Sequence, residues 1–467
     1  MANVQHDLIV IGSGPGGYVA AIRAGQLGLD TLVIEKDTNL GGTCLQRGCI
    51  PTKALLHTAD LLQHAREGAK FGVVCGEVTL DLKAAHAHKD RVVLKNSKGV
   101  EFLFKKNKVA WVQGTGKLLG KGLVEITRAD GSIEQRQAKH IVLATGSMCG
   151  DLPHIKADGE RIINSDHALK LPEVPGRLLV LGAGAVGMEF ASIFHRFGAK
   201  VTVVELLDRV LPLEDTEVSA EVDKSFRKQG ITTHVATRVE EVKVEGGVVH
   251  ARAVTAKGET LQLEADKLLL GVGRVAVFKG IGLENTQVQV ERGRLLVDEF
   301  CRTHEPGVYA IGDLINTPWL AHVASMEGIM AVEHLAGKNP PPIDYRQVPS
   351  CTYCHPEVGS IGLTEAQAKD KGHDVKTGSF PFSAIGKAAI IGETGGFVKI
   401  VADAKYGEIL GVHIVGPHAT ELIAEASAAL RGELTVDELV HTIHAHPTLH
   451  EAIHEAAEAV HGAAIHI

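Results

Sequence analysis

Asp7-Leu8-Ile9-Val10-Ile11-Gly12-Ser13-Gly14-Pro15-Gly16-Gly17 begins as an apolar run and ends in a glycine-rich turn. A helical pattern follows over 18–27, and a second apolar run over 31–34 ends at an acidic residue. This order predicts a strand–helix–strand unit whose glycines admit a pyrophosphate and whose acid accepts a hydrogen bond from a ribose hydroxyl. The candidate binding residues of this first dinucleotide site are Gly12, Gly14, Gly17 and Glu35.

The same pattern returns further along the chain. An apolar run over 177–181 leads into Gly182-Ala183-Gly184-Ala185-Val186-Gly187, then a helical pattern, then an apolar run over 201–204. The repeat predicts a second dinucleotide-binding domain with candidate residues Gly182, Gly184, Gly187 and Glu205. The carboxylate of Glu205 would accept from a free 2′-hydroxyl and repel a 2′-phosphate, so this site favours NAD over NADP.

Two cysteines lie just after the first unit, in Gly41-Gly42-Thr43-Cys44-Leu45-Gln46-Arg47-Gly48-Cys49-Ile50-Pro51-Thr52-Lys53. Residues five apart in a regular helix have Cα atoms about 8.5 Å apart, whereas a disulfide needs less than about 7 Å. A bridge between Cys44 and Cys49 therefore requires a distorted turn, for which Gly48 and Pro51 are suited. The sequence thus predicts a redox-active dithiol close to a dinucleotide.

Composition narrows the class of protein. The chain has 467 residues, enough for about three domains, with 45% hydrophobic and 22% charged residues and a net charge of −8. This net charge indicates no basic face for nucleic acid and no polybasic lipid anchor, and no apolar run is long enough to cross a bilayer. Seven cysteines are too few for a disulfide framework, and a strand starting near Leu8 leaves no room for a leader. We therefore expect a cytoplasmic protein.

In order and combination, these motifs resemble the two-cysteine flavoprotein disulfide reductases, most closely the dihydrolipoamide dehydrogenase branch. The resemblance covers nearly the whole chain and includes ATGS at 144–147, GVGR at 271–274, YAIGD at 309–313 and HAHPTLHE at 444–451. It implies an α/β fold with two doubly wound dinucleotide-binding domains, for FAD and NAD, and a C-terminal α+β interface domain that forms a homodimer. The implied domains are 1–149 and 278–346 for FAD, 150–277 for NAD, and 347–467 for the interface.

The resemblance also implies roles for individual residues. Cys49 would face the flavin and Cys44 would exchange disulfides with substrate; His446 would be the acid–base group, oriented by Glu451. Lys53 and Glu189 would form an ion pair beside the flavin. Further implied contacts to FAD are Gly42, Thr43, Gly116, Asp313, Ala321 and His322, and further implied contacts to NAD are Val239 and Gly271. No metal is implied.

The resemblance implies oxidation of protein-bound dihydrolipoamide through the disulfide and FAD, with hydride passed to NAD⁺. The implied partners are the lipoyl domains and the core acyltransferase of a 2-oxo acid dehydrogenase complex, and no nucleic acid or membrane. The chain departs from the family pattern at Cys149, at Ala185 and at Val275-Ala276-Val277, where an Arg-Pro-Asn run is usual.

Parts of the sequence also match the patterns of other protein classes. His450-Glu451-Ala452-Ile453-His454 matches the HExxH pattern of zinc hydrolases, although the downstream residues offer no third ligand of that pattern. Cys351 and Cys354 form a CxxC pair that is packed and inert or an auxiliary redox or metal pair. Another NAD(P)H-dependent disulfide or metal reductase, or a non-catalytic subunit of a dehydrogenase complex, would share parts of the pattern.

Overall fold

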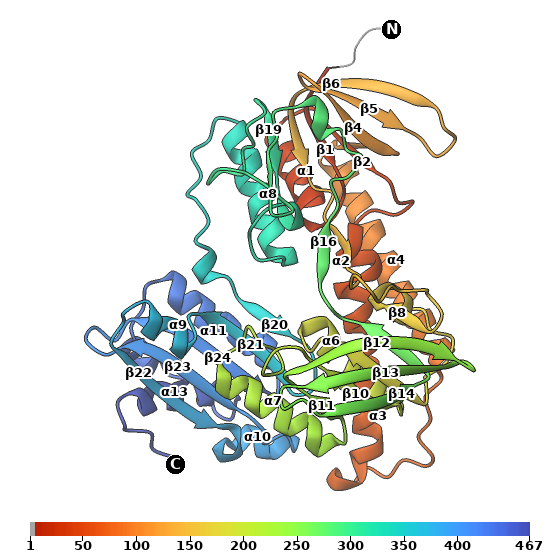
Figure 1. The fold of residues 1–467 in the computed structure, drawn as a ribbon. Helices are drawn as coiled ribbons and strands as arrows, with labels where there is room; N and C mark the ends of the chain where they lie inside the picture. The colour runs from red at the N-terminus through yellow and green to blue at the C-terminus, as the bar shows by residue number, and fades with distance from the viewer. Residues whose placement is uncertain (1–4) are drawn as a thin grey trace. The chain divides into compact units, whose positions relative to one another are not determined.

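The computed structural model describes residues 5–467, which divide into two compact units (Figure 1). The first unit comprises 1–55, 83–150 and 274–345, of which 5–55 are described in its first segment; the second comprises 56–82, 151–273 and 346–467. Both units combine parallel sheets with helices, which confirms the predicted α/β class. The implied boundaries between FAD, NAD and interface domains stay a prediction.

The first unit is built on a central parallel sheet. Its strands are β3, β2, β1, β6 and β19 in that order, and β6 continues into the antiparallel strands β5 and β4. The strands at its centre are almost wholly buried because helices or strands cover both faces, as their uninterrupted apolar runs require. The bounds are β1 Gln5–Ile11, β2 Thr31–Glu35, β3 Ala110–Gln113, β4 Thr115–Gly120, β5 Leu123–Thr127, β6 Ile133–Leu143 and β19 Val308–Ala310.

Helices α1 (Pro15–Gln26) and α8 (Ala321–Leu335) pack side by side on this sheet. Their close approach depends on Gly16 and Gly328, because a Cβ on Gly328 would lie 2.6 Å from the carbonyl oxygen of Gly16. The unit also contains α2 (Gly42–Arg47), the first turns of α3 (Cys49–Glu67) and nearly all of α4 (Leu82–Lys106). Two short ribbons complete it: β7 (Ser147–Cys149) with β16 (Arg274–Ala276), and β17 (Val290–Glu291) with β18 (Arg294–Leu295).

The second unit repeats the parallel arrangement. Its sheet has the order β11, β10, β9, β15, β8, all parallel, and a three-stranded antiparallel sheet, β12–β13–β14, follows β11 in the chain. The bounds are β8 Ile162–Asn164, α5 Ser165–Ala168, β9 Arg177–Leu181, α6 Ala185–Phe197, β10 Lys200–Val204, α7 Thr216–Gln229, β11 Thr232–His234, β12 Thr237–Glu245, β13 Val248–Thr255, β14 Thr260–Ala265 and β15 Lys267–Leu270.

The C-terminal part of the second unit is α+β, as implied. An antiparallel sheet of order β20, β21, β24, β23, β22 packs against α11 and α13 around its own apolar core. The bounds are β20 Ser350–Thr352, β21 Glu357–Gly362, α9 Glu365–Asp370, β22 Val375–Pro381, α10 Gly386–Ile391, β23 Phe397–Asp403, β24 Ile409–Gly416, α11 Ala419–Arg431, α12 Val436–His441 and α13 Glu451–Val460.

A buried charge cluster joins this sheet to α7. The side chain of Lys399, on β23, is 3% exposed, and its Nζ lies 3.1 Å from Asp215, 2.5 Å from Glu217 and 2.7 Å from Glu365. Asp215 is also the N-cap of α7. One fully paired cation thereby ties the start of α7 to the C-terminal sheet, since burying it unpaired would be costly.

Candidate active site

The two glycine-rich turns have matching backbone geometry. Gly12 and Gly182 have φ of 104° and 96°, where a side chain would be strained, and a Cβ on either would collide with the end of a neighbouring strand. Gly17 and Gly187 let the helix pack on its strand, since their Cβ atoms would lie 2.0 and 1.9 Å from the carbonyl oxygens of Gly12 and Gly182. Packing therefore explains four of the six glycines that the sequence proposes for dinucleotide binding.

Packing does not explain the middle glycine of either turn. Gly14 and Gly184 are the N-caps of α1 and α6, have ordinary φ values, and would have nothing within 4 Å of a Cβ. Each of these glycines lies at a helix N-terminus next to open space. A glycine there allows an anionic group to come close to the backbone amides. Both turns thus fit the pyrophosphate of a dinucleotide.

The two acids also occupy matching positions. Glu35 is 3% exposed, and its carboxylate accepts from the amide of Ser13 (2.8 Å), the hydroxyl of Ser13 (2.6 Å) and the amide of Asp37 (2.9 Å). Glu205 is 8% exposed and accepts from the amides of Ala183 (2.6 Å) and Leu207 (2.8 Å). A carboxylate has about four acceptor positions, so each acid retains capacity for a ribose hydroxyl.

The other residues implied for NAD lie around the second turn. Gly271 follows β15, and its carbonyl oxygen would lie 2.5 Å from a Cβ on Gly182. Val239 lies on β12, two residues after Thr237, whose amide donates to the carbonyl of Glu205 (2.9 Å). The structure thus groups Gly182, Gly184, Gly187, Glu205, Val239 and Gly271 within the second unit.

The residues implied for FAD, except Glu189, lie in the first unit. Gly42 packs on the first turn, where its Cβ would lie 2.6 Å from the Cα of Gly14, and Gly116 packs on Ile11. Asp313 accepts a hydrogen bond from the hydroxyl of Ser147, and the backbone carbonyl of Ser147 accepts one from the hydroxyl of Thr43 (3.4 Å). Ala321 and His322 form the start of α8.

A glutamate that the sequence did not single out supports Asp313. Glu327, on α8, is fully buried and accepts from the amide of Gly312 (2.7 Å) and the hydroxyl of Tyr345 (3.0 Å). Burial raises the pKa of Glu327. No motif marks this residue, because only the fold brings it beneath the turn that carries Asp313.

The dithiol lies at the junction of two helices. Helix α2 ends at Arg47, its C-cap Gly48 has φ −133° and ψ −113°, and α3 begins at Cys49. The predicted break in the helix between the two cysteines is therefore confirmed. A hydrogen bond with Cys49 and burial raise the pKa of the Cys44 thiol, while the charge of Lys53 acts in the opposite direction. The two sulfurs and the lysine thus form one interacting group.

The candidate acid–base pair lies in the second unit. Nδ1 of His446 lies 2.8 Å from Oε1 of Glu451, and the amide of Thr448 donates to Oε2 of the same carboxylate (2.9 Å). Burial acts to raise the pKa of Glu451, but the hydrogen bonds from His446 and Thr448 outweigh it and leave that pKa below its usual value. The side chain of His446 is 77% exposed, so its Nε2 is available to a reacting thiol.

Glu425 on α11 is a second carboxylate that the sequence did not indicate. It binds Nε2 of His444 (2.6 Å) and Nδ1 of His450 (2.7 Å), one histidine on each side of His446. The segment that carries the candidate acid–base group is thereby held at both ends. The separation of Glu425 from this segment in sequence gives no local signal for the contact.

Glu189 and Lys53 belong to different units, so their implied ion pair stays a prediction. Within the second unit Glu189 is 5% exposed and accepts from the amide of Tyr353 (3.0 Å). The nearby CxxC cysteines contact different carbonyls, Thr420 for Cys351 and Pro356 for Cys354. Burial raises the pKa of Cys354, which favours its inert thiol form.

The HExxH residues are engaged elsewhere. His450 binds Glu425 and Glu451 binds His446, while the rings of His454 and His444 lie 5.7 Å apart. Among residues 5–467 no group of three or more His, Cys, Asp and Glu side chains is arranged to hold a metal ion. No helix in that range is both long and apolar enough to cross a membrane.

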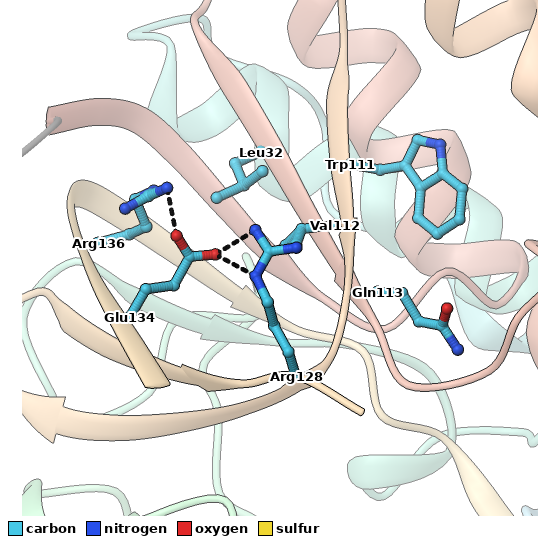
Figure 2. Close-up of a pocket in the computed structure, with 7 residues that line it drawn as sticks. All are labelled: Leu32, Trp111, Val112, Gln113, Arg128, Glu134 and Arg136. Atoms are coloured by element: carbon cyan, nitrogen blue, oxygen red, sulfur yellow. Dashed lines mark hydrogen bonds and ion pairs between the residues drawn. The ribbon is translucent and has the colours of Figure 1, made fainter. Parts of the chain in front are cut away.

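A cavity of about 360 Å³ lies elsewhere in the first unit (Figure 2). Glu134 bridges two arginines there, at 2.6 Å from Arg128 and 2.5 Å from Arg136, and the side chains of Trp111 and Gln113 point away from them. None of the candidate site residues lines this cavity. Its charged groups, Arg128, Glu134 and Arg136, pair with one another, so the cavity does not resemble a reaction centre.

Comparison with known families settles the relationship. Residues 6–328 match the family described as pyridine nucleotide-disulphide oxidoreductase, and residues 348–457 match the dimerisation domain of that family. The chain belongs to the pyridine nucleotide-disulphide oxidoreductases. The resemblance inferred from the motifs is therefore confirmed, and FAD and NAD are the cofactors of its dihydrolipoyl dehydrogenase branch.

Relatives of this oxidoreductase match along almost its whole length. The dihydrolipoyl dehydrogenase of Bacillus subtilis (strain 168) is 47% identical over 472 residues, covering 99% of each chain, and the mitochondrial one of Pisum sativum is 43% identical over 466 residues, covering 99% of this chain and 93% of its own. Among solved structures, LpdA from Mycobacterium tuberculosis has a TM-score of 0.89 at 30% identity, covering 97% of this chain and 99% of its own.

Proposed function

We propose that this oxidoreductase catalyses the NAD⁺-dependent oxidation of protein-bound dihydrolipoamide. The observation that carries the proposal is the hydrogen-bonded pair Cys44 and Cys49, placed across a helix break in the unit that also contains the first dinucleotide turn. Full-length relatives named dihydrolipoyl dehydrogenase support the choice of substrate. The proposed residues are those implied by the motifs, with Cys44, Cys49, His446, Glu451, Lys53 and Glu189 at the reaction centre.

The disulfide exchange can be written with its electrons balanced. A dihydrolipoyl thiolate attacks Sγ of Cys44 in the Cys44–Cys49 disulfide, which forms a mixed disulfide and releases Cys49 as a thiolate. His446 takes the proton of the second dihydrolipoyl thiol, and that sulfur then attacks the mixed disulfide. Lipoyl disulfide leaves, and the two substrate electrons remain on the sulfurs of Cys44 and Cys49.

His446 supplies the proton transfer that this exchange requires. Only the thiolate is nucleophilic, and a free thiol with a pKa near 8.5 is mostly protonated at neutral pH. A positioned base contributes typically 10²–10⁴ in rate. Glu451 fixes the ring through Nδ1 and, as a carboxylate, stabilises the imidazolium that forms.

The cofactors fit the two glycine-rich turns. FAD bound at the first turn would accept the two electrons from the dithiol, and NAD⁺ at the second would receive them as hydride. Lys53 follows Cys49 by one helical turn on α3, so its cation would lie near the sulfur that releases electrons. The carboxylate of Glu205, held beside the second turn, would accept from a free 2′-hydroxyl and repel a 2′-phosphate, which supports NAD over NADP.

We infer the finer partners from the same relatives. The match to a dimerisation domain supports a homodimer, and the substrate class implies the lipoyl domains and core acyltransferase of a 2-oxo acid dehydrogenase complex as partners. Seven cysteines in 467 residues are too few for a disulfide framework, which supports a reducing, cytoplasmic compartment. The partner proteins, not the residues of the reaction centre, determine which 2-oxo acid dehydrogenase complex the enzyme serves.

Substitution of Cys44 tests the proposal. We expect Cys44→Ser to lose turnover of dihydrolipoamide by at least about 10³-fold, because the exchanging sulfur is gone. The variant should retain bound flavin, because Cys44 is not needed for the dinucleotide turn. Steady-state oxidation of dihydrolipoamide with NAD⁺, beside the flavin content, gives both readouts. Wild-type turnover by the variant would contradict the proposal.

A further inference from the structure

Helix α4 (Leu82–Lys106) presents an unusual outer face. Its buried residues, among them Ser97, Val100 and Phe104, lie along one side. At about 100° per residue, five cations lie within about 60° of Phe102 on the other side. We call these six exposed residues the basic face: Arg91, Lys95, Lys98, Phe102, Lys105 and Lys106.

The basic face is a concentrated charge on an acidic protein. The chain has a net charge of −8, yet the acidic residues on the same stretch, Asp90 and Glu101, lie about 100–120° away from Phe102 around the helix. None of the five cations pairs with a carboxylate anywhere in residues 5–467. Unpaired like charges raise the free energy of the face, and an acidic partner would relieve that repulsion.

Phe102 gives the basic face an apolar centre. Its side chain is 66% exposed in the middle of the cations. A large aromatic residue surrounded by polar ones is a typical arrangement of a protein-binding surface, since the aromatic group provides contact area and the charges at the rim steer the partner.

The inner side of α4 contacts the segment that leads to the dithiol. Oγ of the buried Ser97 donates to the carbonyl of Leu40 (2.9 Å), and the same carbonyl accepts from the side chain of Gln46 on α2 (2.7 Å). Leu40, Leu45, Val100 and Phe104 share one core cluster. Figure 1 shows α4 beside α2 in the first unit. The helix that carries the basic face therefore packs against the segment that positions Cys44 and Cys49.

We propose that the basic face is the docking surface for an acidic carrier domain that presents the dihydrolipoyl group. The proposal rests on the function proposed above, in which the substrate is attached to a protein that must approach the dithiol. Charge complementarity selects the occupant, because a second copy would set five cations against five cations. Leu94 and Leu103, the other large exposed apolar residues of α4, lie about 80–100° around the helix from Phe102 on opposite sides, so the basic face itself offers little apolar surface for insertion into lipid. The basic face would thus bind the carrier domain, whereas the dithiol and His446 would carry out the disulfide exchange.

Kinetics with two substrates test this proposal. The variant is Arg91→Glu/Lys95→Glu/Lys98→Glu, and the matched control is Lys257→Glu/Lys371→Glu/Lys376→Glu, which changes three exposed lysines of the second unit by the same charge. The substrates are free dihydrolipoamide and a reduced lipoyl domain of net negative charge. Each reaction is run at low and high ionic strength.

For the α4 variant we expect KM for the lipoyl domain to rise by about tenfold or more at low salt, because electrostatic steering is reversed. The difference from wild type should shrink as salt screens the charges. Turnover of free dihydrolipoamide should stay within about twofold of wild type, and the control should leave both substrates unchanged. Phe102→Ala should raise KM for the lipoyl domain with little dependence on salt.

Three results would overturn the proposal. The first is an unchanged KM for the lipoyl domain in the α4 variant, or an equal change in the control. The second is binding of the wild type to vesicles of anionic phospholipid that the α4 variant loses while its carrier kinetics stay normal, which would assign the face to lipid. The third is a failure of the wild-type enzyme to oxidise free dihydrolipoamide. That result would contradict the proposed function itself, not only the docking surface.

Discussion

At the scale of single residues, the two acids show how one pattern is used twice. Glu35 and Glu205 each bind the amide that follows the first glycine and the amide two residues after themselves. These bonds hold the turn in the shape that a dinucleotide requires and leave acceptor capacity for a ribose. Each acid therefore shapes the turn and also keeps an acceptor position for the ribose that we propose it binds.

Glu451 carries a prediction at this scale. Glu451→Gln should lower turnover of dihydrolipoamide by about 10- to 100-fold, because a hydrogen bond to a charged group is worth about 1.5–3 kcal/mol. The loss should appear in kcat, since the imidazolium forms during the reaction. Steady-state kinetics of the variant check this, and an unchanged kcat would contradict the role of Glu451.

The same variant has a predictable effect of pH on stability. The pKa of Glu451 is lower in the folded chain than in the unfolded chain, so its contribution is complete above about pH 4.3 and is lost as pH falls through the folded pKa. Wild type should therefore melt above the variant at neutral pH, and the gap should close below about pH 4. A difference in melting temperature that widens in acid would contradict the predicted direction of the pKa shift.

At this scale the sequence predicts what lies in a local motif. The resemblance carried by the HAHPTLHE motif implies that Glu451 orients His446, and the hydrogen bond between these two side chains is present. Glu425 and Glu327 were not expected, because each reaches its partners only after a helix has packed on a distant segment. Such contacts depend on tertiary structure and leave no periodic signal.

At the scale of elements, steric demands in the chain fix the turns. The strands and helices of both dinucleotide units lie close to the ranges expected from the apolar runs. Helix α1 begins at Pro15, three residues before the expected helical pattern over 18–27. Proline suits that first helical position. The three-stranded sheet β12–β14 and the extension of β6 were not predicted, since alternating strands of mixed exposure carry a weak pattern.

The glycines of the second turn allow a matched comparison. Gly187→Ala should destabilise the fold by about 1–3 kcal/mol, because its Cβ would lie 1.9 Å from the carbonyl oxygen of Gly182. Gly184→Ala should leave the melting temperature nearly unchanged, because nothing lies within 4 Å of its Cβ, yet weaken NAD binding. Thermal melting and calorimetric titration with NAD separate the two effects. Equal losses of stability would contradict the assignment of Gly184 to ligand approach.

At the scale of the whole molecule, the residues proposed for the reaction centre come from distant parts of the chain. The dithiol belongs to the first unit, and the His446–Glu451 pair belongs to the second, close to the C-terminus. The family resemblance implies that these groups meet across a dimer. No local pattern specifies that meeting, which is why composition and periodicity alone could not predict it.

Mixed dimers test the shared site. Cys44→Ser and His446→Ala protomers, each inactive as homodimers, should regain about a quarter to a half of wild-type activity when refolded together, because one of the two sites in each hybrid is then intact. Hybrids are quantified by differential tags. Demonstrated hybrids without recovered activity would refute sharing between subunits.

The most direct test of the central claim is an anaerobic titration of the purified flavoprotein with dihydrolipoamide, followed by NAD⁺. One equivalent of dihydrolipoamide should produce a long-wavelength absorption band, and NAD⁺ should then remove the band while NADH forms. The same titration of Cys44→Ser should show neither change. Reduction of the wild type by NADH but not by dihydrolipoamide would contradict the account.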